Sequence, residues 1–136
     1  MRILGLDVGT KTIGVAVSDP MGWTAQGITV IRRSSKERDL EELQSLLDEY
    51  GVTKFVVGLP RRTDGSYGPE AEKISEFGSE LEREFGLPVE YWDERFSTVA
   101  AERILLEGDV SRAKRRQVVD KVAATVILQA YLDRKQ

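Results

Sequence analysis

The sequence predicts an α/β fold in which a five-stranded mixed sheet is covered on both faces by helices. Two features of the chain support this prediction. Three strand-like segments follow one another at the start, and helix and strand patterns then alternate to the end. A length of 136 residues is enough to bury one such sheet but leaves no room for a second full domain. We therefore expect residues 1–136 to form a single domain.

The first part of the chain predicts three strands joined as a meander. Residues 2–8 and 12–18 alternate apolar with small residues, and Gly9-Thr10-Lys11 forms the turn between them. A third strand is expected over residues 23–31, where Gln26-Gly27 would permit a bulge. Small residues on the second strand would leave an open shelf in front of the first.

Helices and strands alternate through the remainder of the chain. Ser34 and Glu37 match a capping box, which predicts a helix that Gly51 ends. Pro69 suits the first position of a second helix, which Gly86 ends. The other predicted elements are strands over residues 53–57 and 88–92, a helix capped by Ser97 or Thr98 and ended by Gly108, and a last helix from about residue 116 to residue 133.

Composition limits the chemistry that this chain can perform. Cysteine and histidine are both absent, which excludes thiolate nucleophiles, disulfides, zinc-thiolate sites and histidine bases. No apolar run reaches membrane-spanning length, and a strand begins where a secretion signal would need a hydrophobic core. We therefore expect a cytoplasmic protein that has no contact with membranes.

Three carboxylates are predicted to meet at one edge of the sheet. Asp7 ends the first strand and Glu94 follows the fifth, so parallel strands would bring both to the edge where α/β folds bind ligands. Asp120 shares the apolar stripe of the last helix with Ala124 and Ile127, so its carboxylate points to the sheet. Grouped carboxylates repel one another unless a cation lies between them, and oxygen ligands favour Mg²⁺ or Mn²⁺. Such a site could activate water for attack on a phosphodiester.

Each acid also has a purely structural interpretation. Asp7 could open a hairpin turn, and Glu94 could stabilise the start of a helix. Asp120 could form a salt bridge, and its candidate partners are Lys11, Arg95 and Lys121. The metal interpretation gains support because all three acids are predicted at the same edge.

A net charge of −3 means that any binding to nucleic acid needs a local basic patch. Four basic residues directly precede or begin the last predicted helix, namely Arg112, Lys114, Arg115 and Arg116. With Lys11 and Arg95, they could contact backbone phosphates beside the acids. The alternative is a solvated loop rich in charge. Tyr67 could stack on bases, whereas Trp92 is expected in the core.

Blocks of sequence across nearly the whole chain resemble the YqgF family of bacterial Holliday-junction resolvase-like proteins. They are Asp7-Val8-Gly9-Thr10-Lys11, Gly58-Leu59-Pro60, Trp92-Asp93-Glu94-Arg95 and Asp120-Lys121 with Ala123-Ala124. The resemblance implies a ribonuclease H-like fold, with Asp7, Glu94 and Asp120 as catalytic metal-binding acids. It further implies a nuclease that matures the 5′ end of pre-16S rRNA, or one that acts on branched DNA.

Two other functions remain open at this point. The Asp7 to Thr10 hairpin also resembles the first phosphate loop of actin-like and sugar-kinase ATPases, although those proteins need two such domains around a nucleotide. A regulator that binds nucleic acid without cleaving it would keep the same fold. We expect a monomer or a weak homodimer.

Overall fold

The computed structural model describes residues 2–61, 64–94 and 112–135. Its elements, in chain order, are β1 (Arg2–Val8), β2 (Thr12–Ser18), β3 (Ala25–Arg32), α1 (Lys36–Tyr50), β4 (Val52–Leu59), α2 (Pro69–Phe85), β5 (Val89–Asp93) and α4 (Arg112–Lys135). The helix predicted after Ser97 lies outside the described residues.

The five strands form one mixed sheet in the order β3-β2-β1-β4-β5. β1 pairs antiparallel with β2, and β2 pairs antiparallel with β3. β1 and β4 are parallel, as are β4 and β5, so these three strands end at the same edge. The structure confirms the predicted mixed sheet and the predicted parallel arrangement of β1, β4 and β5.

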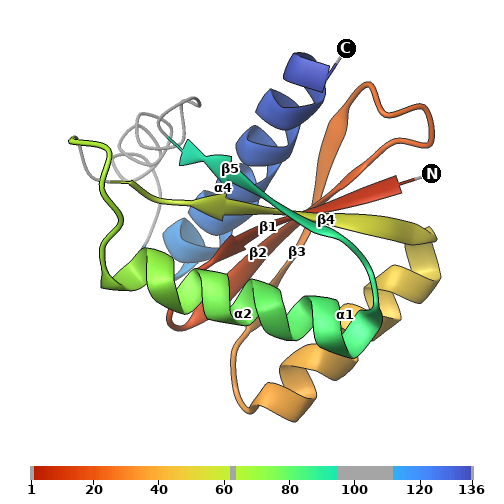
Figure 1. Ribbon diagram of the computed structural model, residues 1–136. Coiled ribbons are helices and arrows are strands. Elements are labelled where there is room, and N and C mark those ends of the chain that lie inside the picture. Colours follow the sequence, from red (N-terminus) through yellow and green to blue (C-terminus); the bar gives the residue numbers. More distant parts are fainter. Residues whose placement is uncertain (1, 62–63, 95–111, 136) are drawn as a thin grey trace.

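Helices cover both faces of this sheet, with α1 and α2 on one side and α4 on the other (Figure 1). Strand alternation sorts the side chains between the two layers. Leu4 and Leu6 of β1 belong to the core beneath α1 and α2, together with Phe55 of β4. A second core, formed around Ala124 and Ile127 of α4, lies against the opposite face.

The ends of the first two helices follow from local sequence. Gly51 and Gly86 adopt the left-handed conformation at the ends of α1 and α2, with φ of 63° and 65°. The N-cap of α1 is Ser35, whose side chain accepts a hydrogen bond from the Arg38 amide at 3.2 Å. The predicted cap at Ser34 was therefore wrong by one residue. The backbone amide of Ser34 instead donates a hydrogen bond to the Asp39 carboxylate at 3.1 Å.

Several element boundaries differ from the sequence prediction by a few residues. β3 begins at Ala25 rather than at residue 23 because the Asp19 carboxylate accepts hydrogen bonds from the amides of Trp23 and Thr24 and closes a loop there. The register shift between Val15 and Ala16 pairs them with Thr29 and Gly27, which confirms a bulge beside the predicted position.

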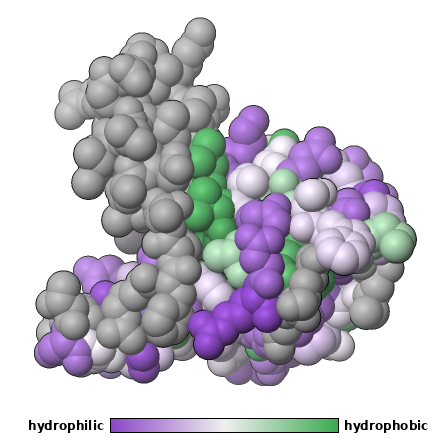
Figure 2. All heavy atoms as spheres, turned by 90° about the horizontal axis from the view of Figure 1, so that it is seen from above, coloured by the Kyte–Doolittle hydropathy of each residue, from purple (hydrophilic) through white to green (hydrophobic). Residues whose placement is uncertain are grey.

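α4 begins at Arg112, about one turn before the predicted start at residue 116. The basic run is therefore part of the helix and not a loop that precedes it. Within the described ranges, no helix is long and apolar enough to span a membrane. On the face shown in Figure 2, hydrophilic side chains predominate among the coloured residues, and a strip of hydrophobic side chains lies near the centre.

Candidate functional site

Asp7 is held near the end of β1 with only 7% of its surface exposed. Alternation along β1 places it on the same face as Gly5, against which Leu128 of α4 packs. In the antiparallel pair its partner is Gly14 of β2. The carboxylate therefore lies on the α4 side of the sheet, beside a residue that has no side chain.

Asp120 reaches this place because α4 lies directly on the backbone of β2. A Cβ atom on Gly14 would overlap the carbonyl oxygen of Asp120. Since Gly14 is paired with Asp7, the close approach brings the backbone of Asp120 next to the Asp7 position. The expected orientation of Asp120 toward the sheet is confirmed.

The Asp120 carboxylate accepts a hydrogen bond from the hydroxyl of Thr12, the first residue of β2. Thr12 and Gly14 are two residues apart on one strand and therefore share the α4 face. Sequence reasoning considered only charged partners for Asp120 and missed this threonine. The contact joins residues separated by 108 positions, so no local sequence pattern predicts it.

Glu94 directly follows β5 and lies over the end of β4. A Cβ atom on Gly58 would come within 2.9 Å of Glu94 Oε1. Gly58 follows Val57, which pairs with Leu6 of β1, and Asp7 follows Leu6. β1 and β4 therefore carry Asp7 and the Gly58 position to the same level of adjacent strands. All three predicted acids are thus placed on one face and at one edge of the sheet.

The donors at this edge suit a hard divalent cation, because they are carboxylate oxygens, and the glycines of β2 and β4 let Asp120 and Glu94 approach the sheet closely. Within residues 2–61, 64–94 and 112–135, no three acidic side chains form a group with the geometry to hold a metal ion. The structure therefore gives the placement of Asp7, Glu94 and Asp120 on their elements. It does not bring their carboxylate oxygens together around one ion-binding position.

The predicted phosphate-binding residues are placed less completely. Lys11 is exposed in the turn between β1 and β2. Arg95 and the side chains of Arg112 and Lys114–Arg116 lie outside the part that the structure describes. Trp92 is buried against α4, with its ring 6.3 Å from that of Tyr131, so its expected place in the core is confirmed.

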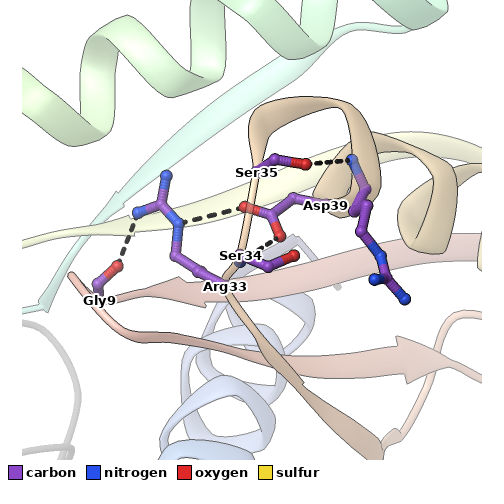
Figure 3. Close-up of polar contacts among 6 residues, drawn as sticks. Gly9, Arg33, Ser34, Ser35 and Asp39 are labelled. Carbon is purple, nitrogen blue, oxygen red and sulfur yellow. Dashed lines mark hydrogen bonds and ion pairs between the residues drawn. The ribbon is translucent and has the colours of Figure 1, made fainter.

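A brace on the other face fixes the turn that follows Asp7 (Figure 3). The Arg33 guanidinium donates to the carbonyl oxygen of Gly9 at 2.7 Å and lies 3.6 Å from the carboxylate of Asp39. Its Cζ atom is also 5.1 Å from the centroid of the Phe77 ring. Asp39 is buried, so this pairing offsets its desolvation. Asp39 is an acid at a position of α1 that faces the core. This unusual position was the sequence signal for the brace, and the sequence analysis overlooked it.

A second polar cluster anchors the far end of α4 to β4 and β5. Lys54 Nζ lies 2.6 Å from the Tyr131 hydroxyl and 2.8 Å from Glu90 Oε1. Burial alone would lower the pKa of Lys54, but these hydrogen bonds outweigh it and raise that pKa above its ordinary value. Burial chiefly raises the pKa of Tyr131, and Lys54 opposes the rise.

Comparison with known proteins identifies the protein family to which the chain belongs. A family model described as "RuvX: Holliday junction resolvase" matches residues 1–134. A protein of Moorella thermoacetica named "Putative pre-16S rRNA nuclease" is 63% identical over 134 residues, which cover 98% of this chain and 96% of that protein.

Two solved structures share the fold at low sequence identity. RuvC of T. thermophilus in complex with a Holliday junction substrate matches with a TM-score of 0.57 and 16% identity, over 99% of this chain and 96% of that one. The Fowlpox virus resolvase in complex with Holliday junction DNA matches with a TM-score of 0.61 and 14% identity, over 99% of each chain. These resolvases have a ribonuclease H-like fold, so the fold implied by the sequence resemblance is confirmed.

Proposed function

The chain belongs to the RuvX family of Holliday junction resolvases, and on that premise we propose that it is a divalent-metal-dependent nuclease. Its reaction is the hydrolysis of phosphodiester bonds in nucleic acid. The observation that carries the proposal is the placement of Asp7, Glu94 and Asp120 on one face, at the edge where β1, β4 and β5 end. The substrate that we propose is the 5′ region of pre-16S rRNA, in line with the name of the relatives. Branched DNA is a second substrate of the same site.

In this proposal Asp7, Glu94 and Asp120 hold Mg²⁺ or Mn²⁺, and all three act as catalytic residues. A bound cation supplies a water of lowered pKa and stabilises the charge that develops on the leaving oxygen. Asp7 is fixed by β1, whereas the Asp120 carboxylate must either share its oxygens with Thr12 or rotate away from it. Thr12 is thus a positioning residue for Asp120.

Backbone phosphates are bound by Lys11, Arg95, Arg112, Lys114, Arg115 and Arg116. α4 carries four of these residues and Asp120 on one continuous helix. Arg116 lies four positions before Asp120, which is about 6 Å along the helix axis. Phosphate contacts of this kind position a strand without reading its sequence.

The remaining parts of the proposal concern the protein as a whole. Residues 1–136 work as one ribonuclease H-like nuclease domain in the cytoplasm. The partner is nucleic acid, either an RNA precursor or branched DNA. The protein acts as a monomer or a weak homodimer and does not engage membranes.

The test is cleavage of defined substrates by the purified protein and its Asp7→Asn variant. Substrates are an RNA that spans the 5′ end of 16S rRNA and a four-way DNA junction. We expect the wild type to cleave at least one of them with Mg²⁺ or Mn²⁺ and not with a chelator. Asp7→Asn should lower the rate by about a thousandfold or more, because a ligand of the reacting centre is lost.

The matched control is Asp48→Asn, which makes the same chemical change on the exposed surface of α1. It should cleave as the wild type does. Mn²⁺ binding, followed by calorimetry, gives a second readout and should weaken only in Asp7→Asn. Equal cleavage and equal Mn²⁺ affinity in the wild type and Asp7→Asn would refute the proposal.

A further inference from the structure

Arg61 lies at the same sheet edge as the acids, in the segment that leaves β4. Its Nη1 atom is 3.3 Å from Asp93 Oδ2. Asp93 is the last residue of β5 and directly precedes Glu94. Asp93 and Leu59 are paired across β5 and β4, so the ion pair closes the end of this strand pair. The guanidinium is therefore held at the end of this strand pair by Asp93, on the face that also carries Leu59, one residue along the chain from Glu94.

Tyr67 covers this guanidinium on one side. The Arg61 Cζ atom lies 4.3 Å from the centroid of the Tyr67 ring, which is a close cation–π geometry. The Tyr67 residue nevertheless remains 48% exposed. One side of the aromatic ring is thus supported by a cation while much of its surface faces solvent.

The backbone around Tyr67 is ordered by its own hydrogen bonds. Asp64 Oδ1 accepts from the Ser66 amide at 2.9 Å and from the Ser66 hydroxyl at 2.7 Å. Gly65 adopts a φ of 90°, which a glycine tolerates without strain. Pro69 then begins α2 two residues after Tyr67. The ring therefore projects from a hydrogen-bonded turn that leads straight into a helix.

The guanidinium has donors to spare among the described contacts. Within that part of the chain, Asp93 is the acceptor that the structure gives to Arg61, and Arg61 Nε is buried without one. A guanidinium offers five N–H donors in a planar fork that suits phosphate oxygens. An exposed aromatic ring that rests on a cation is suited to stacking with an unpaired base.

We propose that Arg61 and Tyr67 form a platform for one unpaired nucleotide at the sheet edge that carries the three acids. The base stacks on the outer side of the Tyr67 ring, and the adjoining phosphate accepts hydrogen bonds from Arg61. The inference rests on the proposed nuclease function and deepens it, because it names the substrate class. That class is a nucleic-acid strand with an unpaired nucleotide next to the cut, and a fully paired duplex does not satisfy it.

The experiment measures binding in a chelator, so that no strand is cut. The probe is an oligoribonucleotide in which one adenine is replaced by a fluorescent analogue whose emission falls when it stacks. The analogue is moved through the positions near the cleavage point. We expect the wild type to quench it at one position, and Tyr67→Ala to abolish that quenching.

Affinity should change together with the fluorescence signal. Loss of one base–aromatic stack should weaken single-strand binding by between about 5-fold and 100-fold in Tyr67→Ala. Tyr67→Phe keeps the ring and should retain both quenching and affinity. Arg61→Gln should keep the fold and weaken binding with a smaller salt dependence, because a phosphate contact is lost. A paired duplex probe should distinguish none of these variants.

Trp23→Ala is the matched control, since Trp23 is 58% exposed in the loop between β2 and β3, away from this edge. It should behave as the wild type does. Full quenching and affinity in Tyr67→Ala would overturn the platform, and so would Tyr67→Phe behaving like Tyr67→Ala. If the wild type cleaves but Tyr67→Ala binds equally well, the platform alone fails. If the wild type neither binds nor cleaves, the nuclease function fails with it.

Discussion

The helices pack against the two faces of the sheet in different ways. Beneath α1 and α2, large side chains such as Leu4, Leu6 and Phe55 are fully buried and fill the space between sheet and helices. Beneath α4, Gly5 and Gly14 present bare backbone, and the helix lies against it. The first face contributes most of the buried apolar residues, whereas the second carries the candidate acids Asp7, Glu94 and Asp120. Stability and function should therefore respond differently to mutation on the two faces.

The largest expected effect tests the packed face. Phe55→Ala should lower the free energy of unfolding by about 3–5 kcal/mol, because a fully buried ring leaves a cavity. Urea unfolding measures this change. At a temperature where the variant is folded, its cleavage rate should stay near that of the wild type, since the ring faces away from the acids. A loss below about 1 kcal/mol would show that this face is not the main source of stability.

A smaller effect on stability, with a larger effect on function, is expected at Gly14. A Cβ atom there would overlap the Asp120 carbonyl oxygen, and two backbones cannot yield as a flexible side chain can. Gly14→Ala should cost about 1–3 kcal/mol and displace α4, which lowers Mn²⁺ affinity and cleavage together. The control is Gly51→Ala, which strains a left-handed residue with open space around it. It should lose about 1 kcal/mol and keep full activity. Normal Mn²⁺ affinity in Gly14→Ala would show that Gly14 is not needed to place Asp120 for metal binding.

The smallest effect concerns the cluster at the far end of α4. The folded-state pKa of Lys54 is raised, so its contribution to stability is complete below the unfolded pKa and is lost as the pH rises through the folded value. Tyr131 acts in the same direction. Stability should therefore fall above about pH 10. Because Glu90 is 42% exposed, the Lys54 share should stay within about 1 kcal/mol.

Lys54→Met tests this assignment through urea unfolding at about pH 8 and about pH 11. It should reduce the alkaline loss of stability, whereas Lys73→Met, which removes a charge from the exposed surface of α2, should not. If both variants keep the wild-type dependence on pH, titration of Lys54 is not the source of the alkaline loss of stability.

The fold could be predicted because its signals are local. Alternation in β1 and β2, the glycines after α1 and α2, and the strand order implied by a meander followed by crossovers all lie within short windows. The start of α4 was missed because Arg112 to Arg116 has no apolar stripe. The α1 cap was misplaced because Ser34 and Ser35 are both plausible caps, and the Asp39 carboxylate decides between them.

The elements that carry the candidate acids could be predicted from the sequence, whereas their contacts could not. The edge occupied by Asp7 and Glu94 follows from strand direction, and the side of α4 that bears Asp120 follows from helical spacing. The hydrogen bond from Thr12, the Arg33 brace and the pairing of Arg61 with Asp93 all join segments distant in sequence. Such contacts depend on how the elements dock. No periodicity or motif in one segment contains that information.

Thr12 and Asp120 are separated by 108 positions, and this separation has a consequence for biosynthesis. During translation the opening hairpin emerges early, while the helix that contributes Asp120 emerges only after nearly all of these residues have been polymerised. A nascent chain can pair β1 with β2 before it possesses the third acid. The proposed nuclease site can therefore form only after α4 has been synthesised.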